Sequence, residues 1–168
     1  MTSENNSVVP DFSRIRAFAF DVDGVFTDGG ILCDLQGELY RTFNAKDGFG
    51  VRMATMKGYP VAIITGGRSG SIVARFRTCG VGQEDVYLGS RDKIADLNDF
   101  CRKYSLERAE ILYVGDDVPD IEAIMSCGIG VSPADGVQEA KDAADVIEKV
   151  MKVRGDWVFD VAHYKKKF

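Results

Sequence analysis

Short apolar runs alternate with longer amphipathic segments along most of the chain. The apolar runs are rich in β-branched and aromatic residues, a composition that favours strands. We expect the main strands at residues 15–20, 61–65, 85–89, 110–116 and 128–132. The amphipathic segments predict helices at residues 46–57, 69–79, 91–104 and 118–126. The pattern closes with a short helix at 136–143 and a short strand over 145–149.

This order of elements predicts the fold class. Nearly continuous apolar strands are typical of sheets buried on both faces, and helices between them imply that the strands run parallel. Right-handed crossovers then give an α/β, doubly wound parallel sheet of the Rossmann-like kind. We expect a disordered lead over residues 1–13, followed by a single domain over 14–168 that includes a C-terminal tail at 152–168.

One segment departs from that rhythm. Two alternating runs flank Leu35-Gln36-Gly37, which predicts a β-hairpin over residues 29–43. Only about 40 residues separate Asp23 from Thr65, and the hairpin and the next helix use them up. The chain therefore has no room for a separate cap domain over the end of the sheet.

Composition narrows the function classes. The 168 residues are 45% hydrophobic and 28% charged, as in ordinary soluble domains, and the net charge of −5 argues against general binding to nucleic acid or anionic membranes. No apolar run reaches membrane-spanning length and the N-terminus lacks a signal-peptide pattern, so we expect a cytoplasmic protein. With one histidine, His163, and no metal-type cysteine spacing, acid–base chemistry has to rest on carboxylates.

Polar residues follow successive strands where each strand ends. In chain order they are Asp21, Asp23, Thr65, Gly66, Lys93, Asp116, Asp117 and Asp120. Taken singly, such residues cap helices, form turns or face solvent. Ligands of open α/β sheets bind beyond the carboxyl ends of the strands, so the combination at this edge predicts a functional site.

The chemistry of this set favours phosphoryl transfer with Mg²⁺. Several carboxylates stay ionised together only where a cation offsets them, and oxygen ligands suit magnesium. A magnesium ion, a lysine and a threonine hydroxyl can hold the oxygens of a phosphoryl group. One carboxylate can then attack phosphorus, while a second moves the proton of the leaving oxygen.

Four stretches carry a family resemblance: "DVDGVFTDG", "IITGG", "RDK" and "VGDDVPD" resemble the signature motifs of the haloacid dehalogenase superfamily of phosphatases. The resemblance implies a nucleophile at Asp21 and a general acid/base at Asp23. It also implies a phosphate-binding set of Thr65, Gly66 and Lys93, metal ligation by Asp21, Asp23 (through its backbone carbonyl) and Asp116, and supporting acidic residues Asp117 and Asp120. Asp28 is expected only to form a turn.

Within that superfamily, the missing cap and the stretch "FNAKDGFGV" (43–51) resemble the capless 3-deoxy-D-manno-octulosonate 8-phosphate phosphatases. The resemblance implies hydrolysis of this phosphosugar to KDO and phosphate, in lipopolysaccharide sugar biosynthesis, through an aspartyl-phosphate. It also implies a homotetramer in which the hairpin and a neighbour's tail close each site. Asp47 and Gly48 are then expected near the substrate. Arg68 is either a partner for a substrate carboxylate or a solvent-facing arginine.

Three other functions stay open at this point. A phosphatase for a nine-carbon keto-acid sugar 9-phosphate is the main rival. A phospho-accepting receiver domain is disfavoured, because its paired acids follow the first strand, whereas here that strand carries Asp-x-Asp and the Asp-Asp pair comes late. A non-catalytic oligomerisation module is the remote alternative. The tail "KVRGDWVFD" keeps Arg154-Gly155 of the family's usual Gly-Gly-Arg-Gly stretch but lacks the preceding glycines and the second arginine. Trp157 is either an intersubunit anchor or a core residue.

Overall fold

The computed structural model describes residues 10–148, and its centre is one parallel sheet with strand order β5-β4-β1-β6-β7-β8. The strands are β1 (Ala17–Phe20), β4 (Val61–Thr65), β5 (Val86–Leu88), β6 (Ile111–Val114), β7 (Ile129–Pro133) and β8 (Val146–Glu148). The predicted tail at 152–168, with Trp157 and His163, lies outside the described residues, as do residues 1–9 of the predicted lead. The lead's last residues begin a 3-10 helix, Phe12–Arg14.

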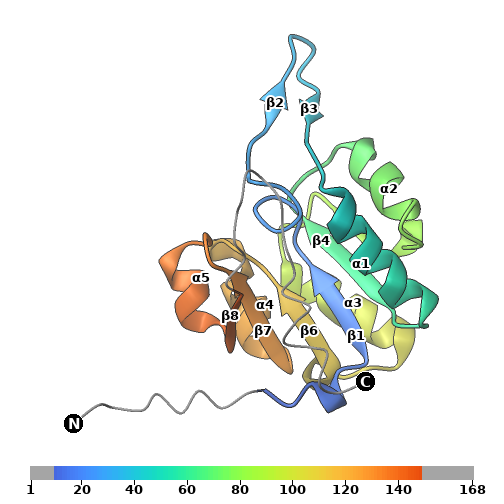
Figure 1. Cartoon of the computed structure of the whole chain (residues 1–168), viewed down its shortest axis with the longest axis vertical. Helices are drawn as coiled ribbons and strands as arrows, with labels where there is room; N and C mark the ends of the chain where they lie inside the picture. Colours follow the sequence, from blue (N-terminus) through green and yellow to red (C-terminus); the bar gives the residue numbers. More distant parts are fainter. Residues whose placement is uncertain (1–9, 149–168) are drawn as a thin grey trace.

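Helices cover both faces of the sheet, so the predicted doubly wound α/β class is confirmed (Figure 1). They are α1 (Ala45–Met56), α2 (Gly70–Arg77), α3 (Lys93–Tyr104), α4 (Ile121–Ser126) and α5 (Gln138–Ala143). Helices α1 and α2 bury Val51, Ile72 and Phe76 against one face. Helices α3 to α5 pack on the other, where β1 contributes only alanines, Ala17 and Ala19. Small residues on this central strand allow the helices to approach the sheet closely.

The predicted helix at 118–126 differs at its start. Val118–Asp120 form a 3-10 turn, and the α-helix begins at Ile121. Asp117 and Asp120 form a capping box around this turn, and proline within it supplies no backbone donor. Strand β6 likewise stops at Val114, short of the predicted 116, which leaves the acidic residues in a loop at the sheet's edge.

The predicted hairpin is present and projects beyond the end of the sheet (Figure 1). Its strands, β2 (Leu32–Cys33) and β3 (Leu39–Tyr40), pair antiparallel. Asp34 Oδ1 closes the turn by accepting hydrogen bonds from the backbone N–H groups of Gln36 and Glu38, both at 2.9 Å. No cap domain is inserted within residues 10–148. Within the same span, no helix has the length and apolar character that crossing a bilayer requires.

Candidate active site

Three carboxylates meet at the carboxyl edge of the sheet. Asp21 follows β1, Asp116 follows β6, and Asp120 ends the 3-10 turn after β6. Strands β1 and β6 are neighbours, and the Asp21 backbone N–H donates to Val114 O at 3.0 Å. One oxygen from each carboxylate lies within 4.8 Å of the others. Parallel pairing therefore brings together residues that lie almost one hundred positions apart in the chain.

Lys93 lies between two of these acids. Its Nζ is 3.2 Å from Asp21 Oδ1 and 2.7 Å from Asp120 Oδ1. Asp21 is only 8% exposed, and this burial, with the charge of Asp120, raises the pKa of its carboxyl group to about 6 against the opposing effect of Lys93. Burial would lower the pKa of Lys93, but the two carboxylates outweigh it and raise that pKa. The lysine thus stays cationic at the edge of the sheet.

Asp116 has a carboxylate oxygen that the described part of the protein leaves without a hydrogen bond. Its Oδ1 is buried and has no hydrogen-bond partner within residues 10–148. Burial first, and then Asp21 and Asp120, raise the pKa of Asp116 to about 7. Gly24 makes this crowding possible, because a Cβ at that position would lie 1.8 Å from Asp116 Oδ2. Oxygen ligands with uncompensated charge fit a divalent cation such as Mg²⁺.

Asp120 accepts hydrogen bonds from several groups of the site. It is fully buried, and its Oδ1 accepts hydrogen bonds from Tyr113 OH at 2.6 Å and Lys93 Nζ at 2.7 Å. Its Oδ2 accepts from the backbone N–H groups of Asp116 and Asp117 at 3.2 and 3.3 Å. These bonds fix both the lysine and the loop that carries Asp116. Asp117 is exposed, and its side chain accepts from the N–H of Val118.

Asp23 is held apart from the three clustered carboxylates by Arg41. The Arg41 Nε lies 2.6 Å from Asp23 Oδ1, and Nη2 lies 2.9 Å from Oδ2. Sequence reasoning missed Arg41, because it lies at the foot of the hairpin and outside the recognised motifs. An alternating strand that carries a basic residue just before the "FNAKDG" stretch is the one signal that could have pointed to it.

Thr65 and Gly66 end β4 on the same edge. Thr65 is almost fully buried, and its Oγ1 accepts a hydrogen bond from the backbone N–H of Gly67 at 3.1 Å. The Thr65 carbonyl accepts from the N–H of Ser90 at 2.9 Å. The turn is thereby anchored to the loop that leads into α3, whose first residue is Lys93. A phosphate bound here would meet the turn and the start of α3 together.

The three residues predicted near the substrate have different surroundings. Asp47 is buried in the first turn of α1. Gly48 leaves room for Arg75 of α2, because a Cβ there would lie 2.1 Å from Arg75 Nη2. Arg68 is exposed, and its side chain lies over Gly89. Their roles toward a substrate stay predictions.

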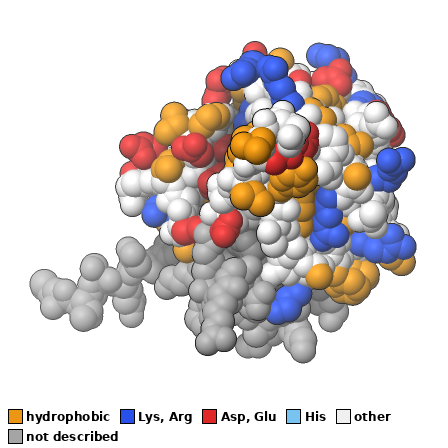
Figure 2. Space-filling model, turned by 90° about the horizontal axis from the view of Figure 1, so that it is seen from above, with side chains coloured by type: hydrophobic (Ala, Val, Ile, Leu, Met, Phe, Trp, Pro, Cys, Tyr) orange, Lys and Arg blue, Asp and Glu red, His pale blue; other side chains and the backbone are white. Residues whose placement is uncertain are grey.

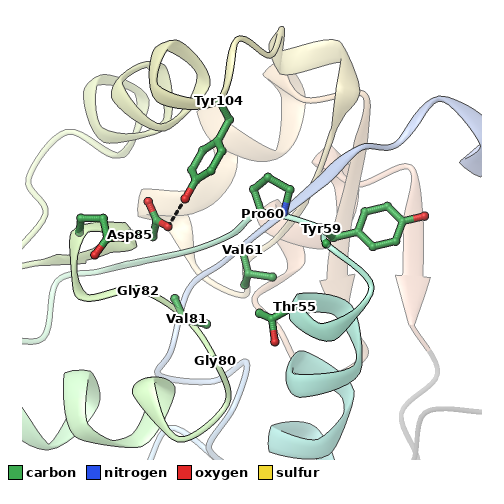
Figure 3. Close-up of a pocket in the computed structure, with 11 residues that line it drawn as sticks. Thr55, Tyr59, Pro60, Val61, Gly80, Val81, Gly82, Asp85 and Tyr104 are labelled. Atoms are coloured by element: carbon green, nitrogen blue, oxygen red, sulfur yellow. Dashed lines mark hydrogen bonds between the residues drawn. The ribbon is translucent and has the colours of Figure 1, made fainter.

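A hollow of about 350 Å³ lies at the opposite edge of the sheet, where β4 and β5 begin (Figure 3). Its buried carboxylate, Asp85, accepts hydrogen bonds from Tyr104 OH at 2.5 Å and Lys103 Nζ at 2.8 Å. The charge of Asp85 is therefore satisfied by the protein. The buried acid of this hollow is thus paired, unlike Asp116 at the other edge, and that other edge remains the candidate active site.

Comparisons with known proteins agree with this geometry. A family model described as haloacid dehalogenase-like hydrolase matches residues 71–155. The 3-deoxy-D-manno-octulosonate 8-phosphate phosphatase KdsC of Escherichia coli strain K12 is 32% identical over 148 residues, 88% of this chain and 78% of that protein.

Two solved structures share the fold. The 3-deoxy-D-manno-octulosonate 8-phosphate phosphatase of Moraxella catarrhalis, solved with magnesium, phosphate and KDO, is 31% identical with a TM-score of 0.78, covering 82% of this chain and 78% of that one. The cobalt-bound form of the corresponding Haemophilus influenzae phosphatase is 29% identical with a TM-score of 0.78, covering 82% and 80%. The chain therefore belongs to the haloacid dehalogenase-like hydrolases and, within them, to the family of 3-deoxy-D-manno-octulosonate 8-phosphate phosphatases.

Proposed function

We propose that this chain is a magnesium-dependent phosphatase that hydrolyses 3-deoxy-D-manno-octulosonate 8-phosphate to KDO and inorganic phosphate, in lipopolysaccharide sugar biosynthesis. The observation that carries the proposal is the buried Asp21 carboxylate, 3.2 Å from Lys93 Nζ and clustered with Asp116. A nucleophile, a cation for phosphate oxygens and an uncompensated ligand for a metal are thereby combined in one site. The names of the relatives supply the substrate.

Magnesium fits the residues present. Asp21 and Asp116 would hold the ion, with the backbone carbonyl of Asp23 as a further ligand. The ion would polarise the phosphoryl group and offset its charge. The protein's own contribution is the buried Oδ1 of Asp116, which accepts no hydrogen bond from residues 10–148 and is thus available to a cation. Asp120 stays bonded to Lys93 and Tyr113, so we assign it a supporting role, with Asp117.

The proposed mechanism has two displacements. The Asp21 carboxylate attacks phosphorus and the bond to the sugar oxygen breaks, while the Asp23 carboxylic acid gives its proton to that oxygen. Thr65 and Lys93, with the backbone of Gly66, hold the phosphate oxygens. Asp23, now ionised, takes a proton from a water molecule that attacks the aspartyl-phosphate. Inorganic phosphate leaves, and both aspartates return to their starting forms.

The stability of the magnesium-free protein is expected to fall as pH rises from about 4 to 7. Asp21 and Asp116 have folded-state pKa values of about 6 and 7, above the ordinary value of 3.8. The folded chain therefore binds more protons than the unfolded chain in this window, and the unfolding free energy decreases there by about 2–4 kcal/mol, allowing for solvent screening at half-buried Asp116. Thermal unfolding in EDTA between pH 4 and 8 measures this.

Magnesium should restore the stability that the metal-free protein loses as pH rises. At ~100 times its Kd, the ion would stabilise the folded chain by about 2.7 kcal/mol at pH 8. The Asp116→Asn variant should show a weaker pH dependence and a weaker response to magnesium. A melting temperature that is constant from pH 4 to 8 in EDTA, or an undiminished magnesium response in the variant, would contradict the assignment.

The decisive test of the substrate is a comparison of kcat/KM for the eight-carbon 8-phosphate and a nine-carbon keto-acid 9-phosphate, with Mg²⁺ present. We expect the eight-carbon substrate to be preferred at least tenfold. Preference for the nine-carbon substrate would make the alternative sugar correct while keeping the mechanism. A folded protein that releases no phosphate from either would support the oligomerisation module instead.

We further propose that Asp47, Gly48 and Arg68 contact the sugar, which Arg68→Met would test through KM.

We also propose a cytoplasmic homotetramer assembled through the hairpin. The hairpin end of the molecule carries hydrophobic side chains among charged ones (Figure 2). Leu35 is 100% exposed and Leu32 is 72% exposed, and burial of a leucine side chain gains about 1.5–3 kcal/mol. The repeated burial of these residues in an assembly would account for their exposure in the single chain.

The double variant Leu32→Glu/Leu35→Glu is expected to sediment as a species smaller than a tetramer, because charge in an apolar interface opposes association. Met125→Glu is the control, since it places a charge on an apolar residue of α4 that is 69% exposed, close to the 72% of Leu32. Sedimentation velocity separates the two results. A tetramer that survives in the hairpin variant would contradict assembly through this surface.

A further inference from the structure

Arg41 has an environment that a surface arginine does not have. It directly follows β3, in the connection to α1, and its side chain is only 1% exposed. Two parallel hydrogen bonds join its guanidinium to both oxygens of Asp23, at 2.6 and 2.9 Å. Its Nη1 donates to the Leu39 carbonyl at 3.3 Å. A bidentate pair of this kind fixes both the position and the plane of a carboxylate.

The guanidinium also lies against the turn after β4. A Cβ at Gly67 would lie 3.0 Å from Arg41 Nη2, so the absence of a side chain there leaves the room that the arginine occupies. A second bond ties the foot of the hairpin to the same region, because Ser69 Oγ donates to Glu38 Oε1 at 2.6 Å. The hairpin is thus bonded to the Asp23 loop and to the start of α2.

We propose that Arg41 is a positioning residue: its guanidinium holds the Asp23 carboxylate in the plane in which Asp23 exchanges a proton with the leaving oxygen, and so links the hairpin to the chemistry. The inference rests on the proposed function, in which Asp23 moves the protons. The Asp23 side chain keeps 28% of its surface exposed, which leaves a side of the carboxylate open to substrate while Arg41 bonds the other.

The pair is compatible with both forms of Asp23. A protonated carboxyl oxygen still has a lone pair that can accept from Arg41, while its own O–H donates to the sugar oxygen. When the proton has moved, the carboxylate accepts two charge-assisted bonds from the guanidinium. Arg41 itself neither gains nor loses a proton, so the proton balance of the two displacements is unchanged.

The test uses two substrates that differ in their need for a proton. The sugar phosphate has an alkoxide leaving group that must be protonated, whereas p-nitrophenyl phosphate releases a stable phenolate without help. We expect Arg41→Met to lower kcat/KM about 100-fold for the sugar phosphate and less than about tenfold for p-nitrophenyl phosphate, since a misplaced catalytic group can cost ~10²-fold. Arg41→Lys should recover part of the loss. Arg102→Met, at an exposed ion pair on α3, is the matched control.

The outcome depends on how the loss in kcat/KM for the sugar phosphate compares with the loss for p-nitrophenyl phosphate. Equal losses on both substrates would mean that Arg41 supports binding or folding, and unchanged rates would mean that it has no role; either result overturns the proposal. If Arg41→Met does not fold, Arg41→Gln carries the same test, because its single amide NH₂ group replaces the guanidinium fork. If the proposed sugar is wrong, the wild-type protein will not hydrolyse it. The two losses are then compared with the phosphosugar that the wild type does hydrolyse in place of the proposed one.

Discussion

Replacement of Asp21 by asparagine is expected to lower kcat for phosphosugar hydrolysis by at least about 10⁴-fold, because the amide cannot attack phosphorus or form the aspartyl-phosphate. The substitution keeps the size of the side chain and its place beside Lys93, 3.2 Å away. Phosphate release at saturating substrate and magnesium measures the loss. Near-wild-type turnover would contradict the assignment of the nucleophile.

The same variant should gain stability while it loses activity. Asp21 is buried beside Asp120, and its pKa of about 6 means that its ionised form is unfavourable in the folded chain above that pH. A neutral amide avoids this cost, so the unfolding free energy at pH 8 in EDTA should rise by about 1–3 kcal/mol. Glu122→Gln, at an exposed carboxylate on α4, is the control and should alter neither property appreciably. If Asp21→Asn lost activity because it misfolds, its unfolding free energy would fall instead.

The second large effect is expected for Asp23→Asn, which should lower kcat for the phosphosugar by about 10²–10⁴-fold, the usual contribution of general acid–base catalysis. The amide can still accept a bond from Arg41, but it supplies no proton to the leaving oxygen. Steady-state rates across pH 5 to 9 measure the effect.

For Asp23→Asn, the control is a second substrate whose leaving group needs no proton. The first step with p-nitrophenyl phosphate needs no proton from the protein, so kcat/KM for this substrate should fall far less than for the phosphosugar. A uniform loss on both substrates would assign Asp23 to phosphate or metal binding rather than to proton transfer. An unchanged rate with the phosphosugar, where chemistry is limiting, would remove Asp23 from the mechanism.

The fold could be predicted from the sequence because its signals are local. Strand β4 occupies the predicted residues, Val61–Thr65, and α1 and α3 agree with prediction to within two residues at each end. The Asn44 and Asp92 side chains that begin these helices act over one turn of chain. The differences arise where polar contacts replace the regular pattern, as at Asp117 and Asp120, which turn the start of the last predicted long helix into a 3-10 turn.

The sequence by itself determined which residue types stand at the carboxyl edge of the sheet, because hydrophobic periodicity locates strand ends and the motifs follow them directly. Only the tertiary structure decided which partner each carboxylate has. Asp120 accepts hydrogen bonds from Lys93 and Tyr113, and Asp23 accepts them from Arg41, 18 residues further along the chain. A pattern of neighbouring residues specifies the backbone element, whereas the direction of a side chain depends on groups that the fold brings from distant parts of the chain.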